Sequence, residues 1–109
     1  DPKVRLHTLL DFIESMKSSL AEAGCPIGSL CQELSKDDGL LAVQAGDILT
    51  MQLAWVQSQF EAMELENPRA LAMELVTNLQ GVSLMANSLS DPQIVTQQIR
   101  RLKDWLDNV

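Results

Sequence analysis

The chain is poor in the residues that most catalytic and nucleic-acid-binding sites use. Of its 109 residues one is histidine, two are cysteine and none is tyrosine, and aromatic residues make up only 4%. Acids outnumber lysines and arginines by 15 to 8, so the formal net charge is −7. An acidic surface repels phosphate backbones and anionic membrane surfaces. We therefore expect this chain on its own to bind neither nucleic acid nor a membrane.

Long apolar runs and a leader segment are also lacking. No apolar run approaches the roughly 20 residues that span a bilayer, and no signal peptide is visible. The first residue is Asp1 rather than Met, so we expect a piece or a processed product of a longer protein. We expect the protein to be cytoplasmic.

The two cysteines, Cys25 and Cys31, are too few to form a disulfide framework. On one continuous helix their side chains would lie roughly 240° apart, at about 100° per residue. We interpret them as reduced, buried, small apolar residues, which fits a reducing cytoplasm. A redox pair or a regulatory thiol is the alternative.

What is present favours helices. The hydrophobic fraction is 46% and consists mostly of leucine, alanine, valine, isoleucine and methionine, whereas residues that favour strands are sparse. Asp1-Pro2, Asn67-Pro68 and Asp91-Pro92 are typical helix starts, with the Asx as N-cap and proline at the first helical position. Apolar residues recur at spacings of three and four. These signals predict four long helices and one short one, over residues 2–23, 26–34, from a start anywhere between 36 and 40 to about 65, 68–88 and 92–109. The fold class is all-α, a bundle of about five helices in a single domain, 1–109.

Glycines and apolar stripes predict how these helices end and pack. Gly24 should end the first helix as a left-handed cap, and Pro26 prevents its continuation. The helix over 40–65 carries two apolar stripes, which predicts a place in the middle of the bundle. Gly46 in this helix is a candidate for close approach by another helix. The last two helices should form an antiparallel hairpin. They have more apolar and small surface than one partner can cover, which favours self-association over a monomeric core.

Recognisable catalytic, metal and cofactor motifs are absent from the sequence. His7 lies one turn from Asp11, but no HExxH, ExxH or CxxC pattern accompanies it. No phosphate loop or G-x-S-x-G elbow is present. Asp47, next to Gly46, is expected in solvent or in a hydrogen bond within the bundle. We therefore expect no enzyme, no metal site and no cofactor.

One set of apolar residues can be interpreted either as plain core or as a partly open pocket. Met, Trp and Cys are adaptable lining residues, which keeps the pocket interpretation open. Gln52 and Gln59 interrupt the stripe of Trp55 and could orient a ligand by hydrogen bonds or face water. The set comprises Phe12, Met16, Ile27, Leu30, Cys31, Met51 and Trp55.

The segment Gly24-Cys25-Pro26-Ile27-Gly28-Ser29-Leu30-Cys31-Gln32-Glu33-Leu34-Ser35 resembles the "G-C-hydrophobic-hydrophobic-G-[NS]-L-x-x-E-L" segment of TetR-type transcriptional regulators. The order of helices is similar too, and residues 80–86 resemble the small-residue segment of the family's penultimate helix. The resemblance covers nearly the whole chain, but only the C-terminal, ligand-binding half of such a regulator. The family's N-terminal helix-turn-helix is missing.

The resemblance implies an effector-sensing and dimerisation domain. Such a protein would be a homodimeric repressor that a small apolar or aromatic effector releases from DNA, and DNA would be bound only through the missing N-terminal domain. The ligand site would comprise Phe12, Ile13, Met16, Ile27, Leu30, Cys31, Met51, Gln52 and Trp55. The dimer interface would comprise Val76, Leu79, Gln80, Ser83, Leu84, Asn87, Ile94, Gln98 and Trp105. The alternative is a helical structural or adaptor module with a packed core and no ligand.

Overall fold

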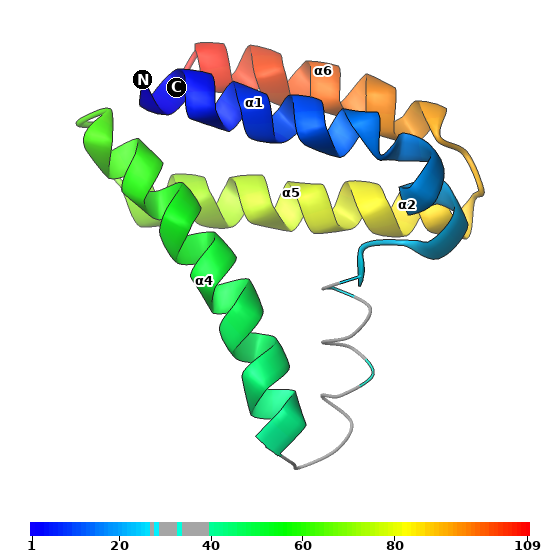
Figure 1. Ribbon diagram of the computed structural model, residues 1–109. Coiled ribbons are helices and arrows are strands. Elements are labelled where there is room, and N and C mark those ends of the chain that lie inside the picture. The colour runs from blue at the N-terminus through cyan, green and yellow to red at the C-terminus, as the bar shows by residue number, and fades with distance from the viewer. Residues whose placement is uncertain (27, 29–32, 34–39) are drawn as a thin grey trace.

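The computed structural model describes residues 1–26, 28, 33 and 40–109, and every regular element in these residues is a helix. The all-helical class is therefore confirmed for this part of the chain. The predicted short helix over 26–34 lies largely outside the described residues, as do the candidate site residues Ile27, Leu30 and Cys31. The helices are α1 (Pro2–Ser15), α2 (Lys17–Ala23), α4 (Leu40–Ala62), α5 (Pro68–Ser88) and α6 (Gln93–Asp107) (Figure 1).

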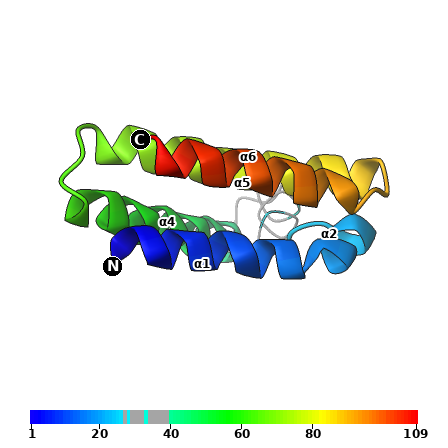
Figure 2. The ribbon, with the colours of Figure 1, turned by 90° about the horizontal axis from the view of Figure 1, so that it is seen from above.

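The helices form two layers. Figure 2 shows α1, α2 and α4 in one layer and the antiparallel pair α5 and α6 in the other. The chain extends over 39 × 32 × 17 Å, and the shortest dimension is less than two helix diameters of about 10–12 Å. In so thin a body each helix has one face between the layers and another face outside.

The core lies between these two layers. Leu6 and Leu10 from α1 and Phe60 from α4 are fully buried there. The edge of Trp105 from α6 meets the Phe60 ring, with the centroids 6.0 Å apart and the planes at 80°. The opposite layer contributes the buried residues Ala72, Leu75, Val76, Leu79, Val82, Ala86, Val95, Ile99, Leu102 and Leu106.

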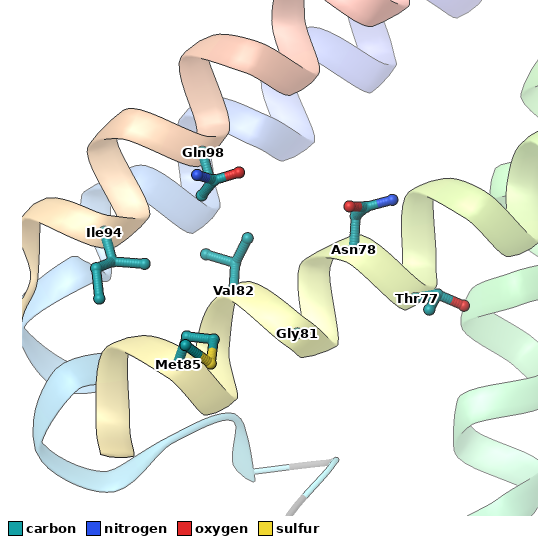
Figure 3. A pocket seen from close by; sticks show the side chains of 7 residues that line it. All are labelled: Thr77, Asn78, Gly81, Val82, Met85, Ile94 and Gln98. Carbon is teal, nitrogen blue, oxygen red and sulfur yellow. The ribbon is translucent and has the colours of Figure 1, made fainter. Parts of the chain in front are cut away.

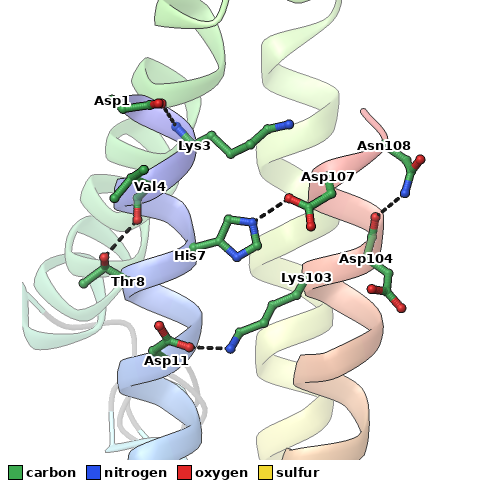
Figure 4. A network of polar contacts seen from close by, with 10 residues as sticks. All are labelled: Asp1, Lys3, Val4, His7, Thr8, Asp11, Lys103, Asp104, Asp107 and Asn108. Carbon is green, nitrogen blue, oxygen red and sulfur yellow. Dashed lines mark hydrogen bonds and ion pairs between the residues drawn. The ribbon is translucent and has the colours of Figure 1, made fainter.

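Two polar ties join α1 to α6 beside this core (Figure 4). His7 Nε2 lies 2.7 Å from Asp107 Oδ1. Lys103 Nζ donates a hydrogen bond to Asp11 Oδ1. The nearest partner of His7 is thus a carboxylate on another helix rather than Asp11 on its own helix. Ion pairs with exposed carboxylates contribute little to stability, so their main effect is to align the two helices.

Helix starts follow the sequence in two of three places. The Asp1 carboxylate accepts a hydrogen bond from the Lys3 amide at 2.9 Å, as an N-cap should. Asp91 accepts from the Gln93 amide at 2.9 Å, although the helix begins one residue later than predicted. Asn67 instead adopts a left-handed conformation, φ 57° and ψ 49°, and its side chain caps nothing.

The first predicted helix is divided at Met16, which the sequence does not indicate. The Met16 amide bonds to the carbonyl of Ile13 at 3.1 Å, three residues back. The preceding Ser15 hydroxyl bonds to the Phe12 carbonyl at 2.5 Å, and such local side-chain bonds compete with regular helix. Because the axis breaks here, α2 can pack on α5. Gly24 then ends α2 at φ 75° and ψ −174°, a positive-φ conformation different from the left-handed helical cap that we predicted.

Among the described residues α4 packs on α1 and α5, and its place in the middle of the bundle stays a prediction. Leu53, Val56 and Phe60 of one predicted apolar stripe are buried, whereas Ile48 and Trp55 of the other stripe are 42% and 43% exposed. Figure 1 shows α4 diverging from α5, which itself contacts α2, α4 and α6. Close approach at Gly46 is not found, because a Cβ built there would meet no described atom within 4 Å.

Both α4 and α5 end in a Schellman motif built on a residue other than glycine. At α4 the amides of Glu64 and Leu65 bond back to the carbonyls of Glu61 and Phe60, and Glu64 has φ 58°. At α5 the amides of Ser90 and Asp91 bond back to residues 87 and 86, and Ser90 has φ 50°. A left-handed conformation costs an L-residue with a side chain roughly 1–2 kcal/mol relative to glycine.

Replacing the left-handed residue by glycine should therefore stabilise the fold. We expect Glu64→Gly and Ser90→Gly each to raise the free energy of unfolding by about 1 kcal/mol, measured by urea denaturation. The matched control is Glu61→Gly in the last turn of α4, where the backbone is helical and glycine should cost about 1 kcal/mol. If Glu64→Gly and Glu61→Gly changed the free energy of unfolding in the same direction, this interpretation would be contradicted.

Candidate functional site

A groove of about 400 Å³ lies between α5 and α6 on the outer side of their layer. Figure 3 shows Met85, Ile94 and Gln98 around it, with Gly81 on the α5 backbone between the labelled side chains. A Cβ built on Gly81 would meet no described atom within 4 Å. The lining residues are Thr77, Asn78, Gly81, Val82, Met85, Ile94 and Gln98.

The chemistry of this groove suits the packing of another helix. Its walls are mostly apolar or neutral, and Met85 is about half exposed although it is apolar. A small residue flanked by larger side chains leaves a hollow that the ridge of a second helix can enter. Exposed apolar surface of this kind marks protein–protein or ligand contacts more often than inert surface.

The predicted dimer residues divide into three groups in the structure. Ile94 and Gln98 line the groove, and Leu84 is exposed on a neighbouring face of α5. Val76, Leu79 and Ser83 are buried in the core of the chain itself, and half-buried Trp105 packs on Phe60. The buried residues therefore have little surface to offer a second copy. The interface itself stays a prediction.

The remaining two predicted dimer residues, Gln80 and Asn87, bond within the chain. The Gln80 amide donates to the Cys25 sulfur at 3.5 Å, and the Asn87 amide donates to the Ala21 carbonyl at 3.1 Å. Ala21 lies in the last turn of α2, where carbonyls lack partners within the helix. These amides tie the end of α2 and the segment after it to α5.

Gly28 lies against Gln80 of α5, where there is no room for a side chain. An ideal Cβ on Gly28 would lie 2.2 Å from Gln80 Oε1, so any side chain there must displace Gln80. A cavity of about 370 Å³ adjoins this contact and is lined in part by Gly24, Cys25 and Asn87. Cys25 is half-buried rather than buried and carries a free thiol, and Cys31 lies outside the described residues. The segment that begins at Gly24 is thus in direct contact with α5.

A third hollow lies between α1 and α4 on the outer face of the other layer. It measures about 440 Å³, and it brings together Phe12 and Trp55 from the predicted ligand site. Sequence reasoning missed the other lining residues. Their spacing of three and four along one helix was the signal that could have found them. They are Val4, Arg5, Thr8 and Leu9.

The other predicted ligand residues that the structure describes do not line this hollow. Ile13 and Met16 are half-buried and pack against the core. Met51 and Gln52 are exposed on α4. Gln59 neither faces water nor stands free, because it is buried, accepts a hydrogen bond from Arg5 Nη1 at 3.4 Å and donates to the Ser58 hydroxyl at 3.3 Å. With the remaining three outside the described residues, the complete ligand site stays a prediction.

In the described part of the chain, no group of three or more His, Cys, Asp or Glu side chains is placed to hold a metal ion. Asp47 is exposed on α4. None of the described helices combines the length and apolar character needed to cross a bilayer.

Comparison with known proteins assigns no family or function to the chain. No protein-family model matches the chain, and no curated protein matches it.

The role of Asn87 can be tested by a pair of identical substitutions on α5. We expect Asn87→Ala to lower the free energy of unfolding by about 1 kcal/mol, because the Ala21 carbonyl loses its donor. Asn78→Ala is the control, since Asn78 is exposed and its amide donates to the Glu74 carbonyl of the same helix, without tying α5 to another described element. Thermal or urea unfolding measures the effect. The role of Asn87 as a tie would be contradicted if Asn87→Ala lowered the free energy of unfolding no more than Asn78→Ala does.

Proposed function

We propose that this chain is the effector-sensing and dimerisation domain of a TetR-like DNA-binding transcriptional regulator. It would act in the cytoplasm as a homodimer that pairs through α5 and α6, and it would contact DNA only through a separate N-terminal domain. A small apolar or aromatic effector would release this repressor from DNA. The observation that carries the proposal is the exposed groove around Gly81 on the outer face of the antiparallel pair α5 and α6.

The resemblance of residues 24–35 to the TetR-type segment supports the effector-sensing part. This segment contacts α5 through Gly28 and Gln80. Gln80 is adjacent to Gly81 in the sequence, and both residues line the cavity of about 370 Å³ beside Gly28. A ligand that displaced the segment would therefore move α5 next to the proposed dimer contact. Sensing of this kind is a shift between two dimer states that bind the effector with different affinity.

A structural or adaptor module is the second candidate. Buried side chains fill the contact between the two layers, which favours a packed core without a ligand inside it. Such a module would still use its outer grooves to bind partners. Ligand binding distinguishes the two candidates.

Oligomeric state tests the dimer. We expect a molar mass by sedimentation equilibrium of twice the 12.1 kDa of one chain. Gly81→Leu should fill the groove and weaken self-association by at least about tenfold, since a tenfold change needs only about 1.4 kcal/mol. Gly46→Leu is the matched control, because Gly46 is also helical with open space around it but lies on α4. A monomeric wild type, or equal dimerisation of Gly81→Leu and wild type, would contradict the proposal.

Thermal unfolding with a panel of small apolar and aromatic compounds tests the sensing role. A ligand at 100 times its Kd should stabilise the native state by about 2.7 kcal/mol. Gly28→Val, which must displace Gln80, should change this response more than Gly46→Val does. If no compound of a broad panel shifts the melting temperature, the adaptor interpretation is favoured instead.

A further inference from the structure

The hollow between α1 and α4 combines exposed apolar side chains with one cation. Val4 and Phe12 on α1 are 58% and 59% exposed, and Trp55 on α4 is 43% exposed. Leu9 and Thr8 complete the wall, and the Thr8 hydroxyl already donates to the Val4 carbonyl at 2.9 Å. Three exposed apolar side chains that meet in one hollow offer a platform for an apolar group.

Arg5 is the cation in this wall, and a neutral group holds it. Its Nη1 donates to Gln59 Oε1 at 3.4 Å, and Gln59 is only 6% exposed. Among the described residues no carboxylate lies within ion-pair distance of Arg5, whereas Lys103 pairs with Asp11. A guanidinium has five N–H donors, so most donors of Arg5 remain available to a ligand. The Gln59 contact orients the head without neutralising it.

We propose that this hollow binds a small amphipathic carboxylate, an alkyl or aryl acid. The apolar part would lie on Phe12, Leu9 and Trp55, and the carboxylate would accept hydrogen bonds from Arg5. Arginine suits this task because its planar fork matches both carboxylate oxygens. The inference names the chemical class of the effector and in that respect rests on the proposed function. The binding step itself needs neither a dimer nor DNA.

The acidic net charge of the protein makes binding of a carboxylate a stringent test of this site. A net charge of −7 favours cationic ligands at long range and disfavours anions. Preference for an anion must therefore come from a local group, and Arg5 is the cation in the lining. Because the hollow is open to solvent, added salt should weaken this preference.

Three probes with eight carbons each, octanoate, octan-1-ol and octylamine, separate the contribution of the charged group from that of the alkyl chain. Binding is followed by tryptophan fluorescence in a Trp105→Phe variant, which leaves Trp55 as the only emitter. Calorimetry on the wild-type chain provides a readout without that substitution. We expect octanoate to bind about tenfold more tightly than octan-1-ol at low salt, and octylamine most weakly.

Variants then assign the preference to its residue. Arg5→Gln should bring octanoate to the affinity of octan-1-ol, and Arg5→Lys should retain part of the difference. Lys3→Gln makes the same charge change two residues earlier, outside the lining, and should leave the ratio unchanged. Phe12→Ser should lower the affinities for octanoate and octan-1-ol about equally, by roughly tenfold, because it removes apolar contact with both ligands. Circular dichroism checks that each variant is folded.

The outcomes are distinct from those of the dimer test. Equal affinity for octanoate and octan-1-ol, tightest binding of octylamine, an unchanged ratio in Arg5→Gln, or no binding of any probe would each overturn the inference. Measuring the molar mass in the same samples separates the two proposals. A monomer that prefers octanoate contradicts only the dimer, whereas a dimer without this preference contradicts only the carboxylate site.

Discussion

The contact between the two helix layers is the interaction on which the rest of the structure depends. Phe60 from one layer and Leu75, Ile99 and Leu106 from the other are fully buried, and the whole chain is only 17 Å thick. With a single layer on each side, every helix contributes one face to the core and leaves the other outside. This constraint accounts for the break at Met16, which lets α2 pack on α5. It also accounts for hollows on both outer faces.

The two outer faces differ in chemistry, and this difference suggests different occupants. Around Gly81 the lining is neutral, a small residue stands between larger apolar ones, and a helix of a second copy can fit. Between α1 and α4 the lining combines Phe12 and Trp55 with a guanidinium, which suits a small molecule with an acidic head. Gly28 contacts Gln80, which directly precedes Gly81 on α5. This junction of Gly28 with Gln80 connects the segment after α2 with the proposed dimer face. In the proposed regulator this junction would transmit effector binding.

Local signals in the sequence predict where the helices lie, but they do not predict which helices pack against one another. Cap residues and periodicity identify Asp1 as an N-cap and place α5 within a residue of its observed bounds, because these features depend on nearby residues. Periodicity also shows which side chains share a face, but not which helix covers it. The pattern therefore places Gln80 and Asn87 on a dimer face, although their amides bond to Cys25 and to the Ala21 carbonyl. Nothing in the sequence singles out Arg5, because its hydrogen-bond partner Gln59 is 54 residues away.

The central claim is that α5 and α6 of two copies meet at Gly81. The most direct measurement is an isotope-filtered NOE experiment on a mixture of ¹³C-labelled and unlabelled protein, which detects only contacts between chains. The Met85 and Ile94 methyl groups flank the groove and are the reporters. The account predicts intermolecular NOEs at Met85 and Ile94 and none at Val4 on the opposite face. Intermolecular NOEs confined to Val4 or its neighbours, or no intermolecular NOE at all, would contradict it.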